Sequence, residues 1–121
     1  MEVIFVFGSN LRGRHGAGSA LEAKQNWGAI QGKGWGRQGA SYAIPTKGRQ
    51  MEVLSLPTIR EYVDAFIMYA MEHPTLKFEV VNIGCGLAGY KPIQIAPLFR
   101  KAPSNCVFQK EFQEVLDRLP K

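Results

Sequence analysis

The sequence predicts an α/β fold in which a mostly parallel sheet carries helices on both faces. Short β-branched and aromatic runs alternate with helix-like stretches of about ten or more residues, and such spacing requires crossover connections between parallel strands. The chain has 121 residues and shows neither an internal repeat nor a linker, which corresponds to one domain. We therefore expect a single domain over residues 1–121, built as an α/β/α sandwich with a mostly parallel, mixed sheet.

The first half of the chain predicts two strands with a helix between them. Residues 2–7 are β-branched and aromatic and run into Gly8-Ser9-Asn10, which predicts a buried strand that leads into a loop. Residues 17–27 hold good helix formers and few breakers. Residues 28–39 hold five of the 13 glycines, so we expect an irregular, mobile connection. Residues 41–46 predict the second strand, with a proline near its end, where a missing donor is tolerated.

The second half predicts two further strands and three helices. Residues 48–56 carry no clear signal, whereas apolar residues recur at helical spacing over 57–71 and a proline at position 74 limits that helix. Residues 77–83 predict a third buried strand. A helix over 92–100 with proline in its first turn, a short strand over 106–108 and a closing helix over 110–119 complete the prediction.

Composition narrows the class of protein. Hydrophobic residues make up 45% and charged residues 21%, which is ordinary for a soluble globular chain. No apolar run is long enough to cross a bilayer, and no signal peptide is recognisable, so we expect a cytoplasmic protein with no membrane partner. Cys85 and Cys106 lack metal-type spacing; we expect reduced thiols, no metal and no cofactor. The net charge of +5 favours an anionic partner without separating a nucleotide from a nucleic acid.

Two glycine-rich segments, residues 8–18 and 84–90, follow predicted strands and lead into predicted helices. Ligands of open α/β sheets sit beyond the carboxyl ends of the strands. Glycines let backbone N–H groups approach a phosphate, and a helix N-terminus adds a positive dipole end. Two such loops facing each other would hold a diphosphate. Neither segment matches the Walker A loop or the dinucleotide-binding fingerprint, which disfavours a kinase or a nicotinamide dehydrogenase.

The order of motifs resembles that of the macrodomain superfamily. Gly8-Ser9-Asn10 is followed by His15-Gly16-Ala17-Gly18-Ser19-Ala20-Leu21, then by Tyr42-Ala43-Ile44-Pro45-Thr46-Lys47, and finally by Ile83-Gly84-Cys85-Gly86-Leu87. The similarity spans roughly residues 3–100. It is greatest to the branch that contains the terminal ADP-ribose protein glycohydrolase and its bacterial toxin-antagonist relatives.

The resemblance implies a fold, a ligand and a set of site residues. The first loop would lie along the distal ribose of ADP-ribose, and the amides of the second loop would hold its phosphates. The ligand-binding residues expected on this basis are Gly8, Ser9, Asn10, Gly16, Ala17, Gly18, Thr46, Gly84, Cys85, Gly86, Leu87, Ala88, Gly89 and Tyr90.

Lys47 and His15 are the expected catalytic residues. Lys47 matches the lysine with which the family attacks the anomeric carbon of the distal ribose to form a covalent adduct. A lysine acts as a nucleophile only when deprotonated, which requires desolvation or a neighbouring cation; Arg14, His15 and Arg49 are candidate neighbours. His15 is a general base or a phosphate contact in one interpretation and an exposed loop histidine in the other.

The sequence departs from the family pattern at two places. Ala88 stands where the family carries its acid–base aspartate, so proton transfer at the glycosidic centre has no assigned carrier. The family also begins with a strand whose aspartate reads the adenine amino group, and we expect this chain to lack that strand, which leaves adenine recognition open.

Several other residues allow two interpretations each. We expect Cys85 to be a small residue in a tight turn rather than a nucleophile. Tyr90 either stacks on the ligand or packs under the next helix. Trp27 is expected in the core, and Trp35 is a stacking platform or a loop anchor. Five basic residues form either a nucleic-acid face or scattered solvated charge; they are Arg12, Arg14, Lys24, Lys33 and Arg37.

Three functions follow from these observations. The leading expectation is binding of ADP-ribose or a related nucleotide, with removal of ADP-ribose from a modified protein or nucleic acid by Lys47. The second is a non-catalytic module that binds or sequesters an ADP-ribose derivative, which Ala88 favours. The third is a small basic nucleic-acid-binding protein. The oligomeric state is left open.

Overall fold

The computed structural model describes residues 1–120 and contains a five-stranded sheet in the order β2-β3-β1-β4-β5. Four strands run parallel to their neighbours: β1 (Val3–Asn10), β3 (Ser41–Lys47), β4 (Lys77–Val80) and β5 (Cys106–Phe108). The short β2 (Gly36–Gln38) pairs antiparallel with β3. The predicted α/β class and the mostly parallel sheet are confirmed.

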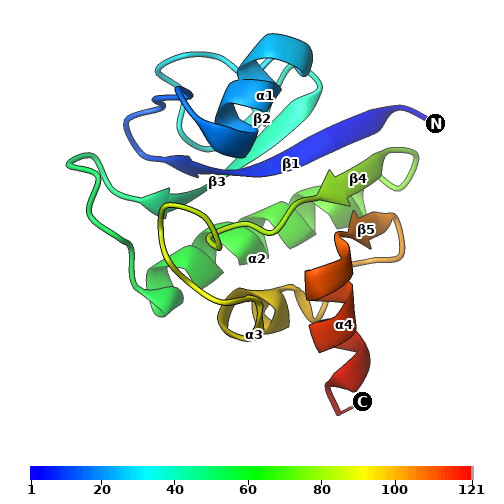
Figure 1. Cartoon of the computed structure of the whole chain (residues 1–121). Coiled ribbons are helices and arrows are strands. Elements are labelled where there is room, and N and C mark those ends of the chain that lie inside the picture. The colour runs from blue at the N-terminus through cyan, green and yellow to red at the C-terminus, as the bar shows by residue number, and fades with distance from the viewer. Residues whose placement is uncertain (121) are drawn as a thin grey trace.

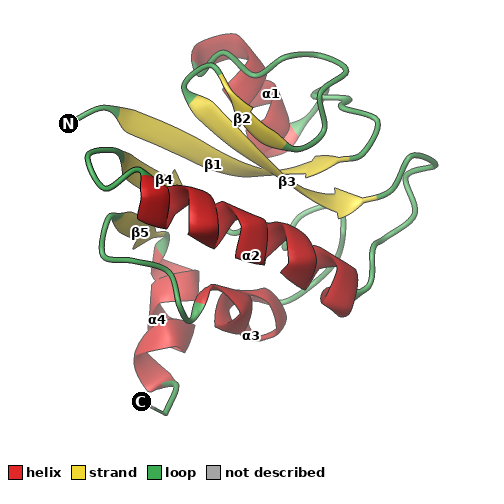
Figure 2. Ribbon diagram, turned by 180° about the vertical axis from the view of Figure 1, so that it is seen from behind, coloured by secondary structure: helices red, strands yellow, loops and turns green. Residues whose placement is uncertain are grey.

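Helices cover both faces of this sheet (Figures 1 and 2). α1 (Gly18–Asn26) lies on one face. The other face carries α2 (Leu56–Glu72), α3 (Pro92–Ile95) with the 3₁₀ turn η1 (Ala96–Phe99), and α4 (Lys110–Arg118). Each face has its own apolar core, a large one under α2 and α4 and a smaller one under α1.

β1 occupies the centre of the sheet and is buried on both faces. Successive side chains of a strand point to opposite faces, so Ile4 and Val6 enter the large core while Phe5 and Phe7 enter the small one. All four are at most 7% exposed. This explains why residues 3–7 form a continuous apolar run instead of an alternating one.

β1 is longer than predicted, because the Gly8-Ser9-Asn10 segment expected to be a loop continues the strand. Gly8 pairs with Ile44 and Asn10 with Lys47, with a bulge between Ser9 and Asn10. β3 runs beside this segment to Lys47, so the parallel ladder continues to that point. Pro45 is tolerated inside β3 since β2 pairs only as far as Ala43 and leaves the outer edge of β3 open there.

The expectation of an irregular connection over residues 28–39 is corrected by the structure. The segment contains β2, and several hydrogen bonds hold the rest. The side chain of Gln38 accepts from Ile30 N at 2.8 Å and donates to Lys33 O at 3.1 Å. Gly32 N donates to Gly13 O at 2.8 Å, which ties the segment to the first glycine-rich loop.

Other boundaries differ by a few residues. β4 ends at Val80 instead of residue 83, because the chain turns sharply where Ile83 N donates to Val81 O. α2 begins at Leu56, capped by Ser55, whose hydroxyl accepts from Thr58 N. The helix expected over 92–100 becomes a 3₁₀ turn from Ala96, where Pro97 has no N–H for an α-helical bond. Within residues 1–120 no helix is long and apolar enough to span a membrane.

Candidate functional site

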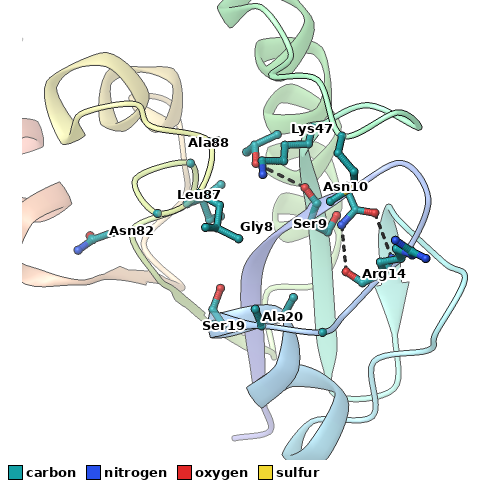
Figure 3. Close-up of a pocket in the computed structure, with 18 residues that line it drawn as sticks. Gly8, Ser9, Asn10, Arg14, Ser19, Ala20, Lys47, Asn82, Leu87 and Ala88 are labelled. Carbon is teal, nitrogen blue, oxygen red and sulfur yellow. Dashed lines mark hydrogen bonds between the residues drawn. The ribbon is translucent and has the colours of Figure 1, made fainter.

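A pocket of about 590 Å³ lies at the carboxyl edge of the sheet. The parallel strands β1, β3 and β4 all end at this edge. After β1 the chain turns to α1 on one face, whereas after β3 and β4 it turns to α2 and α3 on the other (Figure 1). Loops that diverge in this way open a crevice between adjacent strands, and the pocket occupies it (Figure 3).

Most of the predicted site residues line this pocket. Those from the first loop and β1 are Gly8, Ser9, Asn10, Gly16, Ala17 and Gly18, and those from the rest of the chain are Thr46, Lys47, Gly84, Gly86, Leu87 and Ala88. The four that do not line it are His15, Cys85, Gly89 and Tyr90. The structure therefore brings the two glycine-rich loops and Lys47 to one cavity.

The first loop is held by the buried side chain of Asn10. Its Nδ2 donates to Arg14 O at 2.9 Å, and its Oδ1 accepts from Arg14 N at 3.0 Å (Figure 3). Thr46 Oγ1 donates to Ser9 O at 3.4 Å, which joins this loop to the end of β3. The amide of Asn10 thus fixes the course of residues 10–14 along the pocket wall.

Segment 28–39 supports the same loop from behind. Ser9 Oγ donates to Gly34 O. Gly34 packs so closely that a side chain there would collide with the carbonyl of Asn10. A residue without Cβ is therefore required at position 34, and the glycine-rich segment acts as the scaffold of the first loop.

The N-terminus of α1 forms one wall of the pocket. Gly18, Ser19 and Ala20 line it, and the N-cap residue Ala17 has no side chain that could satisfy the first amides of the helix. These amides have no partner within the helix. They also carry the positive end of the helix dipole, which favours an anion.

The second loop, residues 84–90, forms the opposite wall. Gly84 adopts φ +80° and lies against Ile95, whose side-chain carbons would be 3.3 Å from a Cβ at this position. The loop closes on itself where Tyr90 N donates to Gly84 O at 2.9 Å and Gly89 N to Gly86 O at 3.0 Å. Gly86, Leu87 and Ala88 are left facing the pocket.

Lys47 ends β3, half-buried, and lines the pocket together with the exposed Arg14. Lys47 belongs to β3 and Arg14 to the loop that follows β1, and these two strands are neighbours in which Asn10 and Lys47 are register partners. Among the described residues, no Asp or Glu lines the pocket. Its charge is therefore positive, which suits an anionic ligand.

The position of Ala88 matters for any chemistry in the pocket. Ala88 lines the cavity where the resemblance implies an acid–base aspartate. Since no other carboxylate within residues 1–120 lines it, the missing group is not replaced from elsewhere in the fold. The lining of amides and cations suits an anion, but within the described residues it offers no carboxylate as a proton carrier.

His15 is neither an exposed loop histidine nor a pocket residue. Its ring is fully buried and packs edge-on against Phe7, with 5.3 Å between ring centroids. Nε2 lies 3.0 Å from Lys33 O; a carbonyl only accepts, so Nε2 carries the proton. Nδ1 is buried without a partner in the described chain. We interpret His15 as a support of the first loop instead of a general base.

Cys85 and Tyr90 serve packing. Burial, and secondarily the charge of Glu111, raises the pKa of the Cys85 thiol, the opposite of what an activated nucleophile needs. Burial raises the pKa of Cys106 to about 12. Tyr90 donates from its hydroxyl to Leu54 O at 2.5 Å and packs against the large core. The packing interpretation of Tyr90 therefore fits the structure better than ligand stacking.

The remaining candidates divide between core and surface. Trp27 stacks on Phe5 with ring centroids 5.3 Å apart and packs against the small core. Trp35 is 60% exposed. Two of the basic residues form hydrogen bonds with the fold at its surface: Lys33 Nζ donates to Arg37 O, and Arg37 donates to Gly39 O and Tyr69 Oη.

Sequence reasoning missed several residues of the pocket. The sequence suggests Arg14 as a neighbour of Lys47 and as part of a basic surface, whereas in the structure it lines the cavity itself. The other residues outside the prediction are Ser19, Ala20, Met51, Asn82 and Ile83. Ser19 and Ala20 could have been inferred from the helix start, whereas Met51 and Asn82 follow strands without any motif.

Comparisons with protein-family models, with curated proteins and with solved structures find no match for this chain.

Proposed function

We propose that this chain binds ADP-ribose or a closely related nucleotide through its diphosphate. The observation that carries the proposal is the pocket itself: two glycine-rich loops and the N-terminus of α1 face one cavity that is lined by two cations and, within the described chain, by no carboxylate. Backbone amides and a helix dipole are the usual protein partners of a nucleotide diphosphate.

The size of the cavity agrees with such a ligand. Its volume of about 590 Å³ lies within the range of small-molecule sites. Glycines at positions 16 and 86 have no atoms within 4 Å of where a Cβ would lie, so nothing in the fold itself demands their small size. A ligand that approaches the backbone closely would demand it.

The resemblance to macrodomains supports the same ligand. It assigns the first loop to the distal ribose and the second loop to the phosphates. In the structure both segments line one cavity, although about 70 residues separate Gly16 from Gly86 in the sequence.

Removal of ADP-ribose from a modified substrate is a second candidate function, favoured by the position of Lys47 in the pocket. In that reaction the neutral Nζ of Lys47 forms a bond to the anomeric carbon of the distal ribose. The bond from that carbon to the substrate breaks, and the leaving group takes up a proton. Water then releases the sugar from the lysine. With Ala88 in the aspartate position, solvent must supply and accept the protons, so we expect slow turnover at most.

Binding is tested by a thermal-shift series with ADP-ribose, its cyclic and phosphorylated forms, NAD and a short RNA. A ligand at about a hundred times its dissociation constant adds roughly 2.7 kcal/mol to stability, which corresponds to several degrees in a domain of this size. Arg14→Ala should weaken nucleotide binding, and Lys101→Ala, exposed and outside the pocket, is the matched control. The absence of a shift with every nucleotide would refute the proposal.

Turnover and binding are separated by Lys47→Met. If the chain hydrolyses ADP-ribosylated substrates, the wild type should show release of ADP-ribose and an adduct on Lys47 by intact-mass analysis, and the variant should show neither. Tight binding with no release by the wild type selects the binding module. Retention of RNA that weakens steeply with salt, without nucleotide binding, would instead select the nucleic-acid function.

A further inference from the structure

A carboxylate stands beside the pocket on the side of β4, away from Arg14. Asn82 lines the pocket, and its Nδ2 donates to Glu111 Oε1 at 2.9 Å. In Figure 3, Asn82 lies at the opposite end of the lining from Arg14, and its side chain points outward from the pocket. The hydrogen bond therefore places Glu111 just outside the β4 end of the cavity.

Glu111 belongs to the first turn of α4 and meets Asn82 from 29 positions further along the chain. Its charge also contributes, after burial, to the raised pKa of Cys85 in the second glycine-rich loop. Gln109, two residues earlier, fixes the arrangement because its Oε1 accepts from Asn82 N at 2.8 Å.

The carboxylate of Glu111 is ionised and free to accept further hydrogen bonds. The hydrogen bond from Asn82 is the main cause that lowers the pKa of Glu111. No Lys or Arg of the described residues forms an ion pair with Glu111. The neighbouring Lys110 pairs with Glu114, with 4.0 Å between Nζ and Oε1. A carboxylate has about four lone-pair sites, and hydrogen bonds from Asn82 and from the backbone of Glu111 itself leave about two of them open.

These groups give the site a polarity along its length. Arg14 makes one end positive, Lys47, the glycine-rich loops and α1 line the space in between, and Glu111 adds a negative charge beside the β4 end (Figure 3). A fitting ligand carries its anionic groups away from Glu111 and turns neutral hydrogen-bond donors toward it. The adenosine half of an ADP-ribose-type nucleotide has such donors in its ribose hydroxyls and its exocyclic amine.

We propose that Glu111 determines specificity for the nucleoside half of the ligand, by accepting hydrogen bonds from its neutral donors and excluding nucleotides that carry a phosphate there. A carboxylate that binds a ribose hydroxyl repels a phosphate on the same oxygen, as in dinucleotide-binding folds that separate NAD from NADP. This inference rests on the proposed nucleotide-binding function of the same pocket.

The test is a titration of four nucleotides into three forms of the protein. The nucleotides are ADP-ribose, its 2′-phosphorylated form, its 2′-deoxyadenosine form and the hypoxanthine analogue, which lacks the exocyclic amine. The proteins are the wild type, Glu111→Gln and Glu114→Gln. The last variant makes the same change of charge on the same helix, at an exposed residue outside the pocket, and serves as the control.

We expect the wild type and Glu114→Gln to bind the 2′-phosphorylated ligand at least about fivefold more weakly than ADP-ribose, as one unfavourable charge contact implies. In Glu111→Gln this ratio should fall to about twofold or less. Weaker wild-type binding of the 2′-deoxy form identifies the ribose hydroxyl as the donor, and weaker binding of the hypoxanthine form identifies the amine.

The ratio of two ligands on one variant is independent of any change in folding, so a structural role of Glu111 in α4 would leave it unchanged. Equal ratios in the wild type and Glu111→Gln overturn the inference while the proposed function stands. If the wild type binds none of the four nucleotides, the proposed function fails and the inference fails with it.

Discussion

The side-chain amide of Asn10 holds both backbone polar groups of Arg14. Nδ2 donates to Arg14 O at 2.9 Å and Oδ1 accepts from Arg14 N at 3.0 Å, with Asn10 itself only 6% exposed. The family resemblance assigns Asn10 to the distal ribose. In the structure its amide is engaged in shaping the loop, so we expect Asn10 to influence the ligand mainly by positioning residues 10–14.

Asn10→Asp should therefore weaken both stability and binding. The substitution removes the Nδ2 donor and places a carboxylate oxygen against Arg14 O, so we expect a loss of about 1–3 kcal/mol in the free energy of unfolding, as for a buried hydrogen bond whose partner is left unsatisfied. Urea denaturation measures it. Asn26→Asp, the same change at an exposed residue of α1, should be close to neutral, and equal effects of the two variants would contradict the proposed role.

Gly86→Ala separates the needs of the fold from those of the ligand. No atom lies within 4 Å of a Cβ at this position, so we expect stability to change by less than about 0.5 kcal/mol. The methyl group would nevertheless stand on the pocket wall and keep a phosphate away from the backbone. ADP-ribose affinity should fall markedly in calorimetric titration, and an unchanged affinity would argue against phosphate binding by the second loop.

Gly84→Ala, unlike Gly86→Ala, should lower the stability of the fold. Gly84 has φ +80° and a Cβ there would lie 3.3 Å from Ile95, so the alanine suffers both backbone strain and crowding. We expect a loss of about 1–3 kcal/mol in the free energy of unfolding, measured by urea denaturation. The comparison with Gly86→Ala, two residues away, shows whether instability alone reduces ligand binding.

The strands and the pocket can be predicted from the sequence where they depend on residues that are close together in the chain. The apolar runs of β1 and β4 and the glycines behind them are visible without a structure, and parallel strands must present their carboxyl ends at one edge. Lys47 was predicted by its motif, and it does line the pocket. These features depend on residues that are neighbours in the chain.

Features that depend on distant residues escaped prediction. His15 is buried where its ring packs on Phe7 and bonds to Lys33 O, and a histidine between loop residues gives no sign of these contacts. β2 is hidden in a glycine-rich stretch because its three residues need β3 as a partner. Glu111 lies in α4 and accepts a hydrogen bond from Asn82, which stands 29 positions earlier in the chain. No local pattern in the sequence indicates such a contact.

The two thiols should react at different rates. Burial raises the pKa of Cys85, with a smaller contribution from Glu111, and raises that of Cys106 to about 12. Because the thiolate is the reactive form, we expect Cys85 of the native protein to react more slowly at pH 8 than a free cysteine does, and its rate to rise with pH. Cys106 should react only on unfolding. Labelling followed by peptide mass analysis measures both, and rapid modification of Cys85 at neutral pH would revive a nucleophilic role.

Substitutions of His15 distinguish a structural role from a chemical one. His15→Ala removes a buried ring that packs on Phe7 at 5.3 Å between centroids, so we expect a loss of about 2–4 kcal/mol in the free energy of unfolding from the resulting cavity. His15→Phe restores a ring but not the nitrogens. Lys33 O keeps a donor in this variant, because Gln38 Nε2 also donates to it at 3.1 Å.

If His15 supports the loop by packing, His15→Phe should recover most of the stability and bind ADP-ribose within about twofold of the wild type. If His15 acts as a base in turnover, His15→Phe should be stable yet inactive on a substrate that the wild type hydrolyses.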